Sequence, residues 1–170
     1  MRILGSWGML AVAVFSTACG HCDEPQVTDI PSLEVVNEDG KPTAFALDQL
    51  ARLPRTELLV KDRRGEEVKY AGVAVSTLLK EAGTTAGAEL KGKRLADFLL
   101  IEAADKYQVV FSLPEVDPAW TDRVVLLATT RNGEPLAATH GPFQLVVSGE
   151  KLHSRWVKQV VKISVRSGLP

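Results

Sequence analysis

The sequence predicts an α+β fold, and three observations support this prediction. β-rich segments recur at short intervals and are separated by turns that contain Gly, Pro, Asn or Asp. One segment has clear helical spacing, because Val75, Leu78, Leu79 and Ala82 fall on one helix face and Gly83 follows at the capping position. Strand and helix patterns alternate without a regular βαβ rhythm or an internal repeat, which argues against a doubly wound α/β fold.

The first half of the chain is expected to contain four strands and two helices. The expected elements, in order, are a strand over 32–37, a turn over 38–42, a strand over 43–47, a helix over 48–53, a hairpin with strands 56–62 and 66–73, and the helix over 75–83. Asp48 can cap the first helix with its side chain, and Pro54 ends it because proline has no amide donor. The segment "RRG" between the hairpin strands supplies the turn.

The second half is expected to be dominated by strands. The expected elements are strands over 98–105 and 107–113 joined by a turn at Asp105 and Lys106, a loop or short helix over 113–120, a hairpin over 123–136, and strands over 143–149 and 156–165. The pair Asn132-Gly133 is the strongest local hairpin signal, because both residue types tolerate positive φ angles. The last strand alternates only partly, so its end is expected to be buried on both faces.

The N-terminal segment has the layout of a secretory signal peptide over 1–18. Arg2 precedes an apolar run from Ile3 to Phe15, and the small residues Ser16 and Ala18 follow at the positions that a signal peptidase recognises. The run is shorter than the ~20 apolar residues of a transmembrane helix. Cleavage is therefore expected just before Cys19, with export of the mature chain.

The string "STAC" resembles the lipobox of bacterial lipoproteins, in which the cysteine, here Cys19, receives a lipid. Ser16 stands where that motif usually has a bulky aliphatic residue. The string "CGHC", with Cys19 and Cys22, also resembles the active site of disulfide isomerases, whose chemistry needs the first cysteine at a helix N-terminus. Here it follows a signal peptide and precedes a Pro-containing polar stretch, so residues 19–31 are interpreted as a tether. The protein is expected to be a periplasmic or outer-surface lipoprotein attached to the membrane through Cys19, or otherwise secreted.

Composition places one ordinary domain after the tether. Residues 32–170 have a length typical of a single domain with its own core, and they contain no cysteine. Loss of Arg2 with the signal peptide leaves 19 basic against 21 acidic residues, a net charge of -2, so no nucleic-acid partner is expected. The chain contains no nucleophile elbow, P-loop or dinucleotide fingerprint, and its three histidines, at 21, 140 and 153, are not spaced as a zinc site. Acidic residues in turn-rich segments, such as Glu115 and Asp117, are expected to be solvated.

Several segments, taken in linear order, carry a family resemblance. They are "FALDQLARLP", "YAGVAVSTLLKEAG", "IEAADKYQVVFSLPEVDP", "LLATTRNGEPLAATHGPFQLVV" and "SGEKLHSRWVKQVVKISV". Over residues 43–166 the chain resembles the molybdopterin-binding domain of sulfite-oxidase-type oxidoreductases, most specifically in "GVAVSTLL", "NGEPL", "GPFQLVV" and "SRWVKQV". The resemblance implies a mixed α+β domain that binds a pterin cofactor carrying molybdenum.

The resemblance also implies which residues approach the cofactor or another anionic small molecule. The stretch "GEKLHSRWVK" corresponds to the family segment near the cofactor's phosphate and pterin, so Arg155, with Lys151 or Lys158, would hold a phosphate. Ser154 would offer a hydroxyl or backbone donor, and His140 would donate to a pterin edge. Each of these residues also has an ordinary interpretation when it is taken alone. Trp156 is typical of a core residue, and the two lysines are typical of solvated side chains. His140 and His153 are typical of histidines in surface loops.

One departure from the family decides between two functions. The resemblance implies that the family's enzymes ligate molybdenum through a cysteine thiolate in the loop ahead of "YAGVAV", but the corresponding interval here, "LLVKDRRGEEVK", has no cysteine. The first hypothesis is an exported binding or interaction module, with a pterin or anionic ligand or an envelope protein as partner, that has lost molybdenum-thiolate catalysis. The alternative is a pterin- and molybdenum-dependent oxidoreductase of the sulfite oxidase type with a non-cysteine metal ligand.

Overall fold

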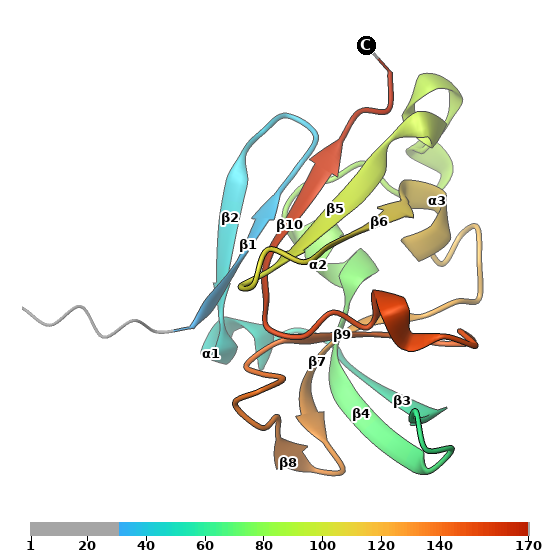
Figure 1. The fold of residues 1–170 in the computed structure, drawn as a ribbon. Helices are drawn as coiled ribbons and strands as arrows, with labels where there is room; N and C mark the ends of the chain where they lie inside the picture. Colours follow the sequence, from blue (N-terminus) through green and yellow to red (C-terminus); the bar gives the residue numbers. More distant parts are fainter. Residues whose placement is uncertain (1–30, 170) are drawn as a thin grey trace, which may run out of the picture.

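The structure is a computed structural model that describes residues 31–169, and two β-sheets with short helices make up this part (Figure 1). The first sheet has the spatial order β2 (Pro42–Ala46), β1 (Ser32–Val36), β10 (Val160–Arg166), β5 (Phe98–Ala103) and β6 (Gln108–Ser112). The second has the order β3 (Arg55–Lys61), β4 (Glu67–Ala74), β7 (Val125–Arg131) and β8 (Glu134–Pro135), and β9 (Gln144–Val147) also pairs with β7. The helices are α1 (Leu47–Leu50), α2 (Val75–Glu81), α3 (Leu113–Val116) and the 3-10 turns η1 (Gly87–Glu89), η2 (Gly92–Ala96) and η3 (His153–Arg155).

The α+β prediction is confirmed, because the first sheet is mixed, the second is antiparallel and the helices are short. β1 pairs with β10 in parallel, whereas every other strand pairing of the described residues is antiparallel. The hairpin predicted around "RRG" is β3–β4, and the Asn132-Gly133 turn joins β7 to β8. Asn132 has φ 52° and Gly133 has φ 88°, as this kind of turn requires.

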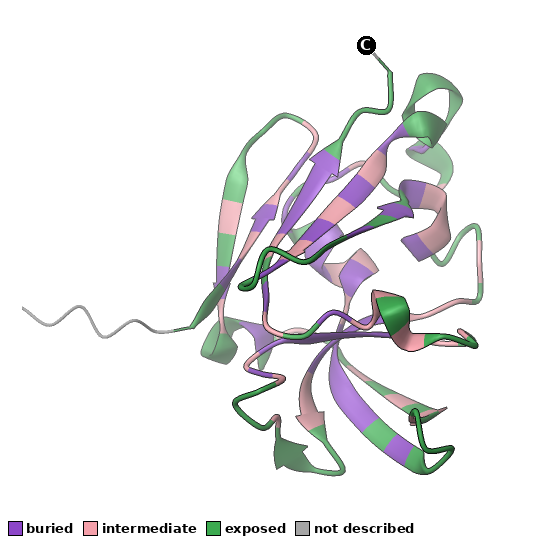
Figure 2. Ribbon diagram, in the orientation of Figure 1, coloured by how far each residue is buried: buried purple, intermediate pink, exposed green. Residues whose placement is uncertain are grey.

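The main hydrophobic core lies between the two sheets. Alternating strand residues such as Leu33, Ile101 and Leu127 are fully buried in it, and α2 adds Val75 and Leu78 (Figure 2). The predicted helical face of α2 is thus the face that packs on the core. Burial of this apolar surface stabilises the fold, and residues 31–169 contain no cysteine that could form a disulfide.

A second, smaller cluster lies on the other face of the second sheet. Its buried members are Val68, Tyr70, Leu126, Ala128 and Val146. Trp156, in the loop between β9 and β10, packs against this cluster and also against the main core. The indole therefore fixes that loop on the sheet.

Several predicted boundaries differ from the structure, and two of them have a clear physical cause. The first helix begins at Leu47 rather than at Asp48, and no side chain caps it; instead Gln49 Oε1 accepts a hydrogen bond of 2.8 Å from the Ala46 amide. The last strand begins at Val160 rather than at Trp156, because Gln159 adopts φ 49° and the segment before it follows β9 as an irregular loop. In that loop the Leu145 amide donates to the Val157 carbonyl at 2.7 Å.

Within residues 31–169, none of the helices is long and apolar enough to cross a membrane. The predicted signal peptide, Cys19, Cys22 and most of the predicted tether lie outside the described residues.

Candidate functional site

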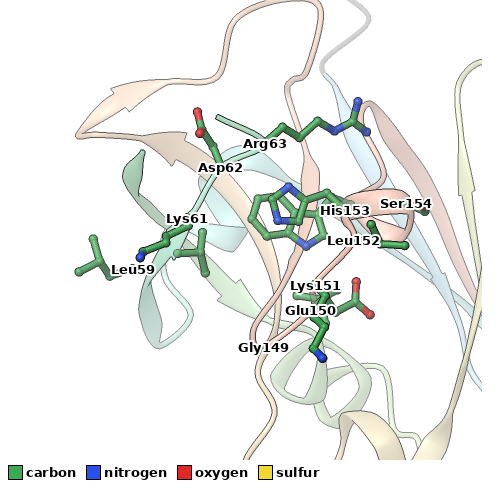
Figure 3. A pocket seen from close by; sticks show the side chains of 13 residues that line it. Leu59, Lys61, Asp62, Arg63, Gly149, Glu150, Lys151, Leu152, His153 and Ser154 are labelled. Atoms are coloured by element: carbon green, nitrogen blue, oxygen red, sulfur yellow. The ribbon is translucent and has the colours of Figure 1, made fainter. Parts of the chain in front are cut away.

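Three adjoining hollows meet on one side of the second sheet and share the side chains of Arg63, His153 and Trp156. Their volumes are about 570, 260 and 380 Å³. The walls come from the β3–β4 turn, the loop 149–159 and, in the second and third hollows, the loop 136–141. Figure 3 shows the first hollow, with Asp62 and Arg63 on the turn at one side and His153 and Ser154 on the loop at the other. We call the three hollows together the basic groove.

Aromatic rings form the floor where the hollows meet. The His153 ring stacks on the Trp156 indole, with centroids 3.8 Å apart and planes inclined by 16°. Tyr70 meets the same indole edge-on at 5.9 Å. Because Trp156 is held by both hydrophobic clusters, this ring platform is rigid and can support a planar ligand.

The charges around the groove are predominantly positive. Five lining cations form no ion pair with a carboxylate of the described residues: Lys61, Arg63, Arg64, Lys151 and Lys158. The carboxylates of Asp62, Asp105 and Glu150 also line it. Asp62 is paired with Arg131 at 3.4 Å and Glu150 with Arg155, whereas Asp105 accepts a hydrogen bond from the Tyr107 amide. The groove therefore attracts anions even though the whole chain has a formal net charge of -1.

His140 lies in the second hollow under the influence of this positive charge. Partial burial, followed by the charges of Lys158 and Arg131, holds the pKa of His140 below its usual value. Its Nδ1 lies 3.0 Å from the hydroxyl of Thr139. The imidazole is consequently neutral around pH 7 and can both donate and accept a hydrogen bond.

Four of the five cofactor-binding residues predicted from the sequence lie together in the basic groove. Lys151 lines the first hollow, Ser154 the first and third, Lys158 the second and third, and His140 the second. Arg155, predicted as the main anchor, lines none of them.

Arg155 instead connects the loop to α3 and β6. Its Nε donates to Glu150 Oε1 at 2.7 Å and its Nη2 to Glu115 Oε1 at 2.9 Å, and the guanidinium lies 4.2 Å from the centre of the Phe111 ring. Glu115, expected to be solvated, also accepts a hydrogen bond from Arg123. This geometry favours a structural role for Arg155, which tethers the groove loop to the rest of the domain.

Sequence reasoning did not single out several residues that line the groove. Arg63 and Arg64 come from the hairpin turn, Arg131 from the end of β7, and Tyr70 and Gln144 from strand faces. The pair "RR" is visible in the sequence as a basic turn. Its proximity to the loop 149–159, about 90 residues away, depends on tertiary pairing that no local pattern reveals.

The groove offers no thiolate and no preformed metal site. Within residues 31–169, no group of three or more His, Cys, Asp or Glu side chains is placed to hold a metal ion. The interval 58–69, where the resemblance places the metal ligand, forms the β3–β4 hairpin. In the turn of this hairpin, the carboxylate of Asp62 accepts hydrogen bonds from the Arg64 and Glu66 amides. These hydrogen bonds stabilise the turn.

Removing the Arg155 tether should destabilise the protein. We expect Arg155→Ala to lower the free energy of unfolding by ~1–3 kcal/mol, because the carboxylate of Glu150, only 10% exposed, loses its partner. Arg155→Lys should recover part of the loss, since an ammonium cannot reproduce the forked contact. Urea denaturation of the three proteins measures this. Arg52→Ala is the control, and should change stability by less than ~1 kcal/mol because its pair with Asp48 is exposed.

The opposite result would restore the anchor role expected from the resemblance. If both Arg155 variants unfold like the parent but bind anions more weakly, Arg155 contacts a ligand and its ion pairs are incidental.

Comparisons with known proteins agree with the fold. The family model described as "Oxidoreductase molybdopterin binding domain" matches residues 21–168. The crystal structure of the sulfane dehydrogenase SoxCD from Paracoccus pantotrophus is similar, with a TM-score of 0.61 and 25% sequence identity over 79% of this chain and 37% of that chain. This chain thus spans well under half of that neighbour, and a comparison with curated proteins finds no match. The family match over nearly the whole chain confirms the resemblance: the protein belongs to the oxidoreductase molybdopterin-binding domain family.

Proposed function

We propose that this protein is an exported binding module of its family, which holds a planar organic anion of the pterin type in the basic groove and has lost molybdenum-thiolate catalysis. The observation that carries the proposal is the meeting of unpaired cations with the stacked rings of His153 and Trp156. Such a combination suits a ligand with a flat ring and a negatively charged end.

The residues of the groove fit the organic part of the family's cofactor. Arg63 lies where all three hollows meet, and Lys158 lines two of them, so both can approach a phosphate or carboxylate. Neutral His140 can hydrogen-bond to a ring edge without repelling a cationic neighbour. Lys151 and Ser154 extend the same wall into the first hollow.

The residues do not fit the metal. Molybdenum bound in this family's manner needs a soft anionic donor from the protein, and residues 31–169 provide none. Asp62, the carboxylate in the corresponding hairpin turn, already accepts from two backbone amides and pairs with Arg131. The proposal therefore assigns binding, and no redox step, to this chain.

The alternative proposal is a pterin- and molybdenum-dependent oxidoreductase with a non-cysteine metal ligand. Family membership supports it, as does the structural likeness to a protein described as a sulfane dehydrogenase. The lack of a thiolate donor in the described domain favours the binding module over this alternative. The binding module can also bind an envelope protein as its partner.

Anion binding should change the titration of His140. A bound anion favours the imidazolium, so we expect inorganic phosphate or pterin-6-carboxylate to raise the pKa of His140, which lies below its usual value in the free protein. Lys158→Met should raise this pKa without any ligand and weaken anion binding, because one positive charge is removed. Titration of the imidazole NMR signals measures both effects.

Lys162→Met is the matched control, since Lys162 pairs with Glu34 on the first sheet, away from the groove. It should leave the pKa of His140 and the anion affinity unchanged. If neither ligand shifts the titration of His140, the groove is not an anion site. The same conclusion follows if Lys158→Met binds anions as tightly as the parent.

We also propose that the mature protein begins at Cys19 and is tethered to a membrane by a lipid there. The support is the apolar run that ends in "STAC". The intact mass of protein recovered from membranes should match cleavage after Ala18 plus acyl groups. Cys19→Ala should abolish the lipid, whereas Cys22→Ser should not. Mature protein that retains residues 1–18 would contradict export.

A further inference from the structure

Strand β3 forms an open edge of the second sheet. Within residues 31–169 it pairs with β4 alone, and its length of seven residues exceeds that of the other edge strands, which have five residues or fewer. Leu59 on this strand is 64% exposed, more than any other large apolar side chain on a strand of the described residues. A long edge strand with an exposed apolar side chain readily pairs with another strand.

The backbone of β3 at Leu59 directs its hydrogen-bonding groups away from the sheet. Leu59 lies opposite Lys69 of β4. The Lys69 amide donates to Asn132 Oδ1 at 2.9 Å, and its carbonyl accepts from the Asn132 amide at 2.7 Å, so both groups point away from β3. Because bonded and non-bonded pairs alternate in an antiparallel ladder, the amides and carbonyls of Glu57, Leu59 and Lys61 are directed to the open edge.

The side chains along this edge are complementary to those of a second copy that runs antiparallel. When Leu59 faces Leu59 of the second copy, Glu57 faces Lys61 on both sides of it. On the other face of the strand, Leu58 meets Val60 of the second copy. Pairs of opposite charge and pairs of apolar side chains stabilise neighbouring strands when they face each other directly. The edge therefore matches itself about a two-fold axis at Leu59.

The two charged residues are available for these contacts. Lys61 forms no ion pair with a carboxylate of residues 31–169. Glu57 pairs with Lys69 through Oε2 at 2.6 Å, and its side chain is 53% exposed, so its Oε1 can accept a hydrogen bond from a second cation. A dimer thus gives Lys61 the partner that it lacks in the single chain.

We infer that the protein forms a two-fold symmetric dimer in which the β3 strands of two copies pair antiparallel about Leu59. The second sheets of the two copies then form one continuous sheet. Leu59 and Lys61 also line the first hollow (Figure 3), so the second copy lies next to the basic groove. The inference does not rest on the proposed function, because the strand pairing needs no anion. A groove that binds no anion leaves the dimer standing, and a monomeric protein leaves the groove standing.

The experiment measures molecular mass by analytical ultracentrifugation over a range of protein concentrations at one low salt concentration. The parent is the full chain with Cys19→Ala and Cys22→Ser, in which neither a lipid nor a disulfide can join two copies. It should dimerise reversibly. Glu57→Lys and Lys61→Glu should each raise the dimer dissociation constant about tenfold or more, because like charges then face each other twice in every dimer.

A mixture of the two variants is the decisive sample. Glu57→Lys and Lys61→Glu in equal amounts should associate as tightly as the parent, because the positive pair of one variant faces the negative pair of the other. This recovery also shows that each variant is folded. Val110→Glu, on the edge strand β6, is the matched control at a half-exposed apolar position and should dimerise like the parent.

Three results would overturn the inference. A parent that stays monomeric at every concentration shows that β3 does not pair with itself. A parent dimer that neither charge variant weakens shows that the copies associate through another surface. Variants that dimerise weakly alone and do not associate in the mixture show that Glu57 and Lys61 do not face each other across the interface.

Discussion

The packing of Trp156 against two hydrophobic clusters is the interaction on which the groove depends. The indole sits in an irregular loop, yet it contacts the main core and the outer cluster of the second sheet, and it supports the stacked ring of His153. Backbone hydrogen bonds hold the end of the loop, because the Leu145 amide donates to the Val157 carbonyl and the Gln159 amide to the His140 carbonyl. Arg155 adds a second tether through Glu150 and Glu115. With the loop fixed at both points, the groove is preorganised, and a ligand loses little free energy in ordering it.

The fixed loop also explains how a slightly acidic protein presents a cationic site. Chain folding brings the basic β3–β4 turn next to the loop that carries Lys151 and Lys158, while the acidic side chains between them are engaged by arginines. Burial and these charges keep His140 neutral, so the second hollow combines a fixed positive field with an uncharged hydrogen-bonding group. Because the cations are partly exposed, salt will weaken binding by screening them.

The sequence predicts interactions between residues that are close in the chain better than interactions between residues that are far apart in it. The hairpin around "RRG", the Asn132-Gly133 turn and the helix near Leu78 depend on local signals, and the structure has all three. The groove residues near Lys158 were predicted only through the family resemblance, because their roles depend on residues far along the chain. The same limit explains Arg155: its partner Glu150 is a near neighbour in the sequence, but its other partner, Glu115, lies 40 positions away. The first helix begins one residue earlier than predicted. The side chain of Gln49 accepts a hydrogen bond from the Ala46 amide, and Asp48 does not cap the helix.

The central claim is that the chain keeps the family's fold and anion groove without thiolate-bound molybdenum. The most direct test is the molybdenum content, by mass spectrometry, of the full chain and of its Cys19→Ala, Cys22→Ser double variant. Both are purified from a host that makes molybdopterin and exports proteins. The account predicts far less than one molybdenum per chain in both proteins. About one molybdenum per chain in the double variant would contradict it, because a group other than cysteine would then hold the metal and the oxidoreductase alternative would stand.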